Sequence, residues 1–237
     1  MDALESHLAP QLDHSRDFFW HRLRWRAVRR HVPVGVSLML VDVGAGAGLL
    51  GEYLAAERPR VEYRFVEPID SLRRGLEARF GAQYGVGAGE PYPDASIVTL
   101  LDVLEHQEDD NRFLREIAGK MERGGRLILT VPALPTLWSG WDESLGHVKR
   151  YTRATLEAAT SGLPFRRVEM GYLFPEMLLA AFVRRRRRAT DAATDDAAFP
   201  DLPPPVNRAL YAIGSATQVA RRVLPAGTSM FAVYERR

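Results

Sequence analysis

The sequence predicts an α/β protein built on a doubly wound parallel sheet, and three features carry this prediction. Apolar runs alternate with helical stretches from Leu38 to Met170, which is the rhythm of strand–helix–strand units. The apolar run from Leu38 to Val43 leads into a glycine-rich turn and then into the start of a helix. The residues from Thr228 to Tyr234 alternate in character, as in an antiparallel strand added to such a sheet. We therefore expect a Rossmann-like sheet whose last strand is antiparallel.

The elements between these limits have local signals of their own. Gly124 and Gly125 stop a helix before the strand that follows, and Pro132 breaks that strand at its carboxyl end. The apolar runs predict strands at 38–43, 61–66, 96–101, 126–131 and 165–171, and the stretches between them predict helices at about 48–57, 69–80, 109–121 and 152–161.

The chain is expected to form a single domain, 1–237, with one addition at the N-terminus and one before the last strand. The core comprises 36–171 and 226–237. The insertion, 172–225, opens with an apolar helix from Phe174, continues through an Ala-, Asp- and Pro-rich mobile linker at about 189–205, and ends in a second helix at about 206–224.

The N-terminal part, 1–35, contains a helical pattern from about 15 to 31. Its adjacent aromatic residues Phe18, Phe19 and Trp20 need a partner surface. Two arrangements would provide this surface: the helix packs on the main domain, or it forms a lid over a ligand cleft.

Composition excludes several classes of site. The 237 residues contain no cysteine, so disulfides, thiolate metal sites and a cysteine nucleophile are excluded. The six histidines are scattered without ligand spacing, so we expect no metal site. We find no apolar run of about eighteen residues and no cleavable apolar leader, and we therefore expect a cytoplasmic protein.

The net charge of +2 conceals two clusters of arginines. Such clusters either form a solvated helix face or bind nucleic acid or anionic lipid headgroups. The first cluster consists of Arg22, Arg24, Arg26, Arg29 and Arg30, and the second is the unbroken run from Arg184 to Arg188.

The turn after the first strand reads D-V-G-A-G-A-G, which resembles motif I of the class I S-adenosylmethionine (SAM)-dependent methyltransferases. A dinucleotide fingerprint, G-x-G-x-x-G, fits less well because Leu49 occupies its last glycine position. The resemblance implies a seven-stranded sheet, and it implies that the methionine part of the cofactor is held by Asp42, Gly44, Ala45, Gly46 and Gly48.

Glu67 ends the second strand, about twenty residues beyond the turn, where an acidic side chain can accept hydrogen bonds from both ribose hydroxyls. The alternative for Glu67 is a structural role at the start of the next helix. We include both Glu67 and Pro68 among the candidate cofactor-binding residues. The resemblance also implies an adenine-binding segment at 86–94, where Gly89 could serve through its backbone or Glu90 could reach in.

The string L-D-V-L-E-H, 101–106, is similar to the motif that follows a central strand in many small-molecule methyltransferases. By this resemblance Asp102 lies next to the sulfonium and the transferred methyl, and Val103 belongs to the cofactor site. Glu105 and His106 are either surface residues of a turn or functional residues, and we include Asp102 and His106 among the candidate catalytic residues.

The segment 132–152 resembles a bacterial methyltransferase subgroup with P-A-x-x-x-L-W-S-x-x-D followed by L-G-H-x-x-R-Y-T, and the resemblance covers almost the whole chain. His147 is the candidate general base, because imidazole titrates near operating pH, or it braces the loop. Trp138 and Trp141 predict an apolar acceptor wall, or they pack the loop down. Lys149 and Arg150 could bind an anionic acceptor that Tyr151 orients.

These observations predict a SAM-dependent methyltransferase that acts on a small-molecule, glycan or lipid-linked acceptor, at oxygen. An NAD(P)-dependent oxidoreductase and a basic nucleic-acid-binding module are the alternatives. We expect no nucleic-acid partner, a monomer or homodimer, and a peripheral membrane contact through Phe174 to Arg188, where an apolar helix runs into the arginines.

Overall fold

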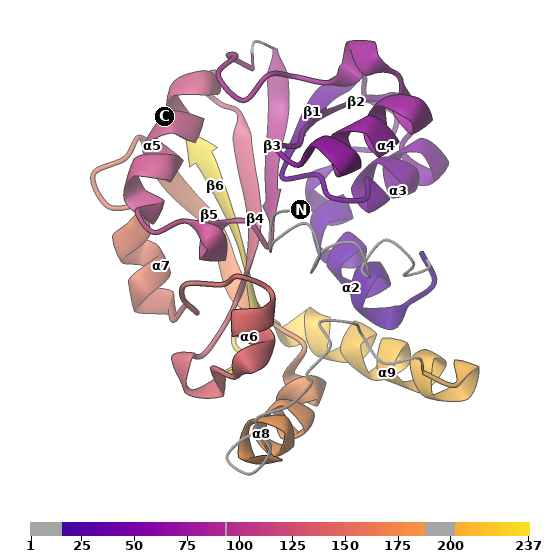
Figure 1. Cartoon of the computed structure of the whole chain (residues 1–237), viewed down its shortest axis with the longest axis vertical. Coiled ribbons are helices and arrows are strands. Elements are labelled where there is room, and N and C mark those ends of the chain that lie inside the picture. Colours follow the sequence, from indigo (N-terminus) through magenta and orange to yellow (C-terminus); the bar gives the residue numbers. More distant parts are fainter. Residues whose placement is uncertain (1–15, 93, 188–201) are drawn as a thin grey trace.

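A computed structural model describes residues 16–92, 94–187 and 202–237. A central mixed sheet with the order β2-β1-β3-β4-β6-β5 carries helices on both faces (Figure 1). β1 to β4 are parallel, whereas β6 is antiparallel to both of its neighbours. The α/β Rossmann-like fold and the antiparallel last strand are thus confirmed. The strands are β1 Leu38–Val43, β2 Val61–Val66, β3 Ala95–Leu101, β4 Arg126–Pro132, β5 Phe165–Leu173 and β6 Ser229–Arg236.

The expected number of strands was wrong, because the described residues form a sheet of six rather than seven. Beyond β2 the chain makes only an isolated parallel bridge between Phe65 and Gly85, with the amide of Val86 donating to the carbonyl of Phe65 at 2.8 Å. The segment that follows α4 is rich in glycine, including Gly85, Gly87 and Gly89, and glycine weakens a strand at a sheet edge.

Helices cover the two faces of the sheet unequally (Figure 1). One face carries α5 (Asp110–Lys120) and α7 (Arg153–Ala159), and the other carries α2 (Phe19–Val28), α3 (Leu49–Glu57) and α4 (Asp70–Phe80). The remaining helices are α6 (Gly140–Ser144), α8 (Leu178–Arg187) and α9 (Pro204–Thr217), with short 3-10 helices η2 (Arg29–His31), η3 (Ala82–Tyr84), η4 (Leu104–His106), η5 (Pro135–Leu137), η6 (Pro175–Met177) and η7 (Gln218–Ala220).

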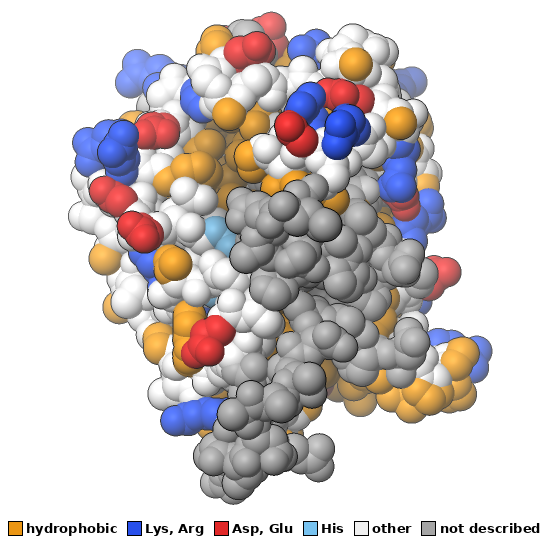
Figure 2. Space-filling view, viewed as in Figure 1, with side chains coloured by type: hydrophobic (Ala, Val, Ile, Leu, Met, Phe, Trp, Pro, Cys, Tyr) orange, Lys and Arg blue, Asp and Glu red, His pale blue; other side chains and the backbone are white. Residues whose placement is uncertain are grey.

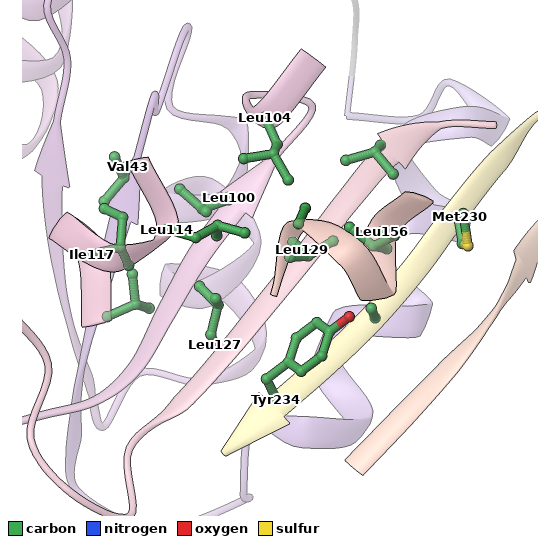
Figure 3. Packing of buried hydrophobic residues seen from close by; sticks show 14 of the residues in the cluster. Val43, Leu100, Leu104, Leu114, Ile117, Leu127, Leu129, Leu156, Met230 and Tyr234 are labelled. Carbon is green, nitrogen blue, oxygen red and sulfur yellow. The ribbon is translucent and has the colours of Figure 1, made fainter. Parts of the chain in front are cut away.

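The core follows from side-chain alternation along the strands. Leu100 and Leu129 point toward α5 and α7, where they meet Leu114 and Leu156 (Figure 3). Ile97, which is an odd number of residues from Leu100, packs with α2 and α3 on the opposite face. Burial on both faces explains why the central strands read as continuous apolar runs.

The insertion packs against α2. The amide of Phe19 donates to the side chain of Asn207 at 2.8 Å, and Gln218 donates to the carbonyl of Leu23 at 2.6 Å. Trp20 stacks on Phe174 with ring centroids 3.7 Å apart. The N-terminal helix therefore joins the insertion to the sheet.

Several expected boundaries lie elsewhere. β5 extends to Leu173, so the insertion begins after the expected residue 172, and the helix predicted from Phe174 starts as η6. α9 begins at Pro204, inside the range expected for the linker; the rest of that linker up to residue 201 lies outside the described residues, as does most of the lid segment before residue 16. No helix within the described parts of the chain is both long and apolar enough to cross a membrane.

Candidate functional site

The carboxyl ends of β1, β2 and β3 meet at one edge of the sheet. The chain leaves β1 toward α3 and leaves β3 toward α5, on opposite faces, which opens a crevice between the two strand ends. Gly44 and Val103 face each other across this point, because a Cβ added at Gly44 would lie 2.6 Å from Val103 Cγ2. The structure thus brings the glycine loop and the 102–106 segment together.

The three glycines of the turn have different reasons to be glycine. Gly44, Gly46 and Gly48 have φ angles of 72°, 55° and 78°, in the left-handed region that favours glycine. A Cβ at Gly48 would collide with Leu76 at 2.5 Å, whereas a Cβ at Gly46 would meet no heavy atom of the described residues within 4 Å. Gly48 is therefore required for packing. Gly46 borders open space, where a ligand can approach the backbone.

Glu67 lies beneath this loop at the end of β2. Its side-chain oxygens accept hydrogen bonds from the amides of Gly46, at 2.7 Å, and Ile69, at 2.9 Å. Burial raises the pKa of Glu67, and these two bonds oppose the rise. A carboxylate has about four acceptor positions, so lone pairs remain for ribose hydroxyls. Open space at Gly46 and a carboxylate with spare acceptors together fit the nucleoside part of SAM; Pro68, next in the chain, is exposed.

Asp42 is bonded to the two neighbouring strands. Its carboxylate is buried in the sheet, where it accepts hydrogen bonds from Thr99 at 2.6 Å and Tyr63 at 3.2 Å. Burial raises its pKa to about 6, and the two hydrogen bonds oppose the rise. Asp42 thus links β1 to β2 and β3, while Ala45 continues the loop with its amide 3.3 Å from the carbonyl of Val66.

Asp102 closes the crevice from the β3 side. It has a φ of 59°, accepts a hydrogen bond from Thr130 at 2.9 Å and forms an ion pair with Arg24 of α2. The sequence did not single out Arg24 among its neighbouring arginines. Its role requires the fold to bring α2 to the end of β3, as the Arg24–Asp102 ion pair shows.

The N-terminal arginines contact other parts of the protein. Arg24 pairs with Asp102, Arg29 Nη1 lies 3.0 Å from Glu57, and the guanidinium of Arg22 lies 3.7 Å from the ring centroid of Tyr211. These contacts within the protein account for three arginines of the first basic cluster, so those three do not require nucleic acid as a partner.

Gly89 and Glu90 are exposed on the loop between η3 and β3. The amide of Glu90 donates to the carbonyl of Gly87 at 2.9 Å, and Lys120 at the end of α5 donates to Ala88. Among the described residues no hydrogen bond joins either Gly89 or Glu90 to Glu67 or to the glycine loop.

The loop after β4 is organised around Asp142. This buried carboxylate lies 3.0 Å from His147 Nδ1 and accepts from Arg150 Nε at 2.7 Å and from the amide of Ser139 at 2.9 Å. Burial would raise the pKa of Asp142, but the hydrogen bonds from His147 and Arg150 lower it below its ordinary value. The imidazole of His147 is consequently held in one orientation.

The other candidate acceptor-binding residues have protein partners. Lys149 donates to the carbonyl of Glu108 at 2.9 Å, and the buried hydroxyl of Tyr151 donates to the carbonyl of Leu104 at 3.1 Å. Both residues also bond to Asp110, while Arg150 additionally donates to Ala133 at 3.0 Å. Trp138 Nε1 donates to Glu143 at 3.2 Å, and both Trp138 and Trp141 are half-buried.

The structure places Glu105 and His106 beside His147. Glu105 is fully buried, which excludes a surface position, and its oxygen lies 3.8 Å from His147 Nε2. The rings of His106 and His147 are 5.0 Å apart, and His106 Nδ1 lies 3.2 Å from the carbonyl of Gly146. We call Glu105, His106 and His147 the histidine–carboxylate cluster; sequence spacing missed it because its two segments lie about 40 residues apart.

A family model described as "Methyltransferase domain" matches residues 6–167, which is more than half of the chain. The "Ubiquinone biosynthesis O-methyltransferase" of Aeromonas salmonicida is 28% identical over 99 residues, which are 38% of this chain and 42% of that protein. The chain thus matches less than half the length of this curated relative.

Solved structures share the fold. A "SAM dependent methyltransferase" from Archaeoglobus fulgidus has a TM-score of 0.57 at 17% identity and covers 95% of this chain and 96% of its own. A phosphoethanolamine N-methyltransferase 2 from Haemonchus contortus, solved with S-adenosylhomocysteine, has a TM-score of 0.59 at 15% identity and covers 90% of this chain and 52% of its own.

When bound, SAM supplies an activated methyl group, and the protein contributes alignment and exclusion of water. The glycine loop, Glu67 and the fold all fit this cofactor, and the family match decides against the oxidoreductase alternative. The chain therefore belongs to the methyltransferase-domain family, and its fold is the one found in SAM-dependent methyltransferases.

Proposed function

We propose that the enzyme transfers the methyl group to a hydroxyl oxygen of an apolar or lipid-linked small molecule. The histidine–carboxylate cluster is the observation that carries this proposal. It lies next to the cofactor crevice, since Val103 contacts Gly44 and Glu105 follows two residues later. A hydroxyl acceptor must lose a proton as it is methylated, whereas an unprotonated amine can attack without help. The similarity to an O-methyltransferase supports the choice of oxygen.

In this proposal the cofactor lies along the carboxyl ends of β1, β2 and β3. The amide edge at Gly46 borders the methionine part, and Glu67 accepts from the ribose hydroxyls. Asp102 faces the sulfonium side, with α2 as a lid that Arg24 fastens to it. Gly89 and Glu90 reach the adenine by a movement of their exposed loop.

The acceptor lies against Trp138 and Trp141, whose half-buried indoles form an apolar wall after β4. Lys149, Arg150 and Tyr151 position this wall, because their polar groups tie the loop to η4, α5 and β4. The acceptor oxygen lies beside His147 and His106 of the histidine–carboxylate cluster, and the hydroxyl proton is lost at this position.

We further propose that the insertion rests on an anionic membrane surface that supplies the acceptor. Leu179, Phe182 and Val183 of α8 are exposed, as is Ile213 of α9. Hydrophobic surface is visible over the outer part of α9 (Figure 2). The second arginine run begins at the end of α8, and basic residues beside apolar ones are typical of a surface that binds anionic lipid.

Product chemistry tests the methylated atom. The enzyme is incubated with methyl-labelled SAM and pairs of aromatic lipids that differ only in carrying a hydroxyl or an amine at one position. We expect label in a methyl ether that resists mild acid and base. Transfer to the amine member alone would contradict oxygen methylation.

Vesicle co-sedimentation tests the membrane contact. Leu179 and Val34 are 76% and 75% exposed, but only Leu179 lies on the insertion. We expect the wild type and Val34→Asp to sediment with anionic vesicles and Leu179→Asp to remain in solution. Equal sedimentation with anionic and neutral vesicles would contradict the proposal.

A further inference from the structure

The histidine–carboxylate cluster has the composition of a metal site. One side-chain donor atom from each of Glu105, His106 and His147 lies within 4.8 Å of the others, a spacing that a single ion can bridge. Histidine surface is visible near the middle of the face shown in Figure 2. The sequence led us to expect no metal, because the donors come from two separate segments.

Both imidazoles are already oriented as metal ligands require. Asp142 holds Nδ1 of His147 at 3.0 Å, and the carbonyl of Gly146 lies 3.2 Å from Nδ1 of His106. When Nδ1–H donates to an oxygen, the lone pair of the imidazole is on Nε2 and is free to coordinate. Metal-binding histidines usually have such an oxygen behind them.

Glu105 supplies an independent observation. It has no exposed surface, and neither of its carboxylate oxygens has a hydrogen-bond partner among the described residues. A buried carboxylate without partners is costly, and a cation next to it removes that cost. Among the described residues, the side chain paired with Glu105 is that of His147. Its Nε2 lies 3.8 Å from Glu105 Oε1, which is beyond hydrogen-bond distance.

We propose that Glu105, His106 and His147 bind a divalent transition-metal ion, with Zn²⁺ as the best match. Imidazole nitrogen suits zinc, whereas magnesium and calcium prefer all-oxygen sites. Three protein ligands leave a coordination position open, as in catalytic rather than structural zinc sites.

The role of the ion rests on the proposed function. The open position takes the acceptor hydroxyl oxygen, whose pKa the ion lowers. The hydroxyl proton passes to solvent, and an oxygen lone pair forms the new O–C bond with the methyl carbon. The C–S bond breaks with its electron pair going to sulfur, so the products are a methyl ether, S-adenosylhomocysteine and one proton. With the ion bound, both histidines act as ligands and neither has to accept the proton.

Cobalt titration of the chelator-stripped full chain tests the site without depending on methyl transfer, because Co²⁺ replaces zinc and absorbs visible light when it binds nitrogen ligands. We expect one Co²⁺ per chain, displaced by Zn²⁺. Glu105→Gln, His106→Ala and His147→Ala should each weaken binding at least tenfold. His21→Ala, which removes a histidine outside the cluster, should bind as the wild type does.

Thermal unfolding in chelator separates lost binding from lost folding. Glu105→Gln removes a buried charge without changing the shape of the side chain, so the metal-free variant should melt no lower than the metal-free wild type. Zinc should raise the melting temperature of the wild type and leave that of Glu105→Gln unchanged.

Absence of Co²⁺ absorption in the wild type, or Co²⁺ binding as tight as that of the wild type in all three cluster variants, would overturn the metal site. Full oxygen methylation in chelator would overturn the catalytic role of the ion and leave oxygen methylation intact. Stoichiometric Co²⁺ binding with methyl transfer only to amines would uphold the site and overturn the proposed function.

Discussion

Replacing Gly46 by alanine tests where the cofactor lies, and Gly162→Ala is its matched control. Both glycines have positive φ, 55° and 71°, and in the part of the chain that the structure describes a Cβ at either position would meet no heavy atom within 4 Å. Each substitution therefore costs about 1–2 kcal/mol for a left-handed alanine and creates no clash within the protein. Gly162 lies in the exposed turn after α7, at the opposite edge of the sheet from the glycine loop.

Only the new methyl at residue 46 occupies space assigned to SAM. Inserting a methyl group into a close contact costs about 1–3 kcal/mol, which corresponds to roughly a 5- to 150-fold loss of affinity. Calorimetric titration with S-adenosylhomocysteine should show this loss for Gly46→Ala and wild-type affinity for Gly162→Ala, while both variants unfold at similar temperatures. Equal affinities in the two variants would refute this position for the cofactor.

Three further variants test the fold around the site. Asp42 has a folded-state pKa of about 6, above its unfolded value. As pH rises from about 4 to 6, its ionisation should therefore lower the unfolding free energy by up to about 3 kcal/mol. In urea titrations, the unfolding free energy of Asp42→Asn should not decline over this pH range. Glu169→Gln leaves the buried Arg221 without its carboxylate and should lower the unfolding free energy by about 3 kcal/mol near pH 7. His31 and the neighbouring arginines hold the pKa of Glu169 well below its usual value despite its burial, so wild-type stabilisation should persist above about pH 4.5 and fade in acid. Gly214→Leu should separate α9 from α2 and speed limited proteolysis there, because even a Cβ at Gly214 would lie 2.2 Å from Leu23.

Each of these predictions has a result that would contradict it. An unchanged pH profile in Asp42→Asn would mean that another group titrates. A Glu169→Gln protein as stable as the wild type at pH 7 would show that the ion pairs do not stabilise the fold. Gly75 on α4 borders open space, so Gly75→Leu is the control for Gly214→Leu, and equal proteolysis of the two would argue against the α2–α9 contact.

The fold was predictable where local pattern decides structure. The helix expected at 109–121 is observed as α5, Asp110–Lys120, because its signals are an N-cap and an apolar face within a few turns. The seventh strand depended on family resemblance rather than on an apolar run, and it is absent from the described sheet. The packing of α9 on α2 joins residues about 190 positions apart, which no local pattern encodes.

The site was predictable where residues follow strand ends. Gly46, Glu67 and Asp102 all lie at the carboxyl edge, since parallel strands end together. The hydrogen bonds of Asp42 to Thr99 and Tyr63 were not predictable, because they depend on which side chains the neighbouring strands place beside it. The burial of Glu105 could not be predicted from the sequence, because it depends on how the loop after β4 packs over η4.

The most direct test of the account is the structure of the enzyme with S-adenosylhomocysteine. We expect the ribose hydroxyls within hydrogen-bond distance of the Glu67 carboxylate and the ligand backbone alongside Gly46. A nucleoside bound elsewhere on the sheet, with Glu67 bonded only to the amides of Gly46 and Ile69, would contradict it.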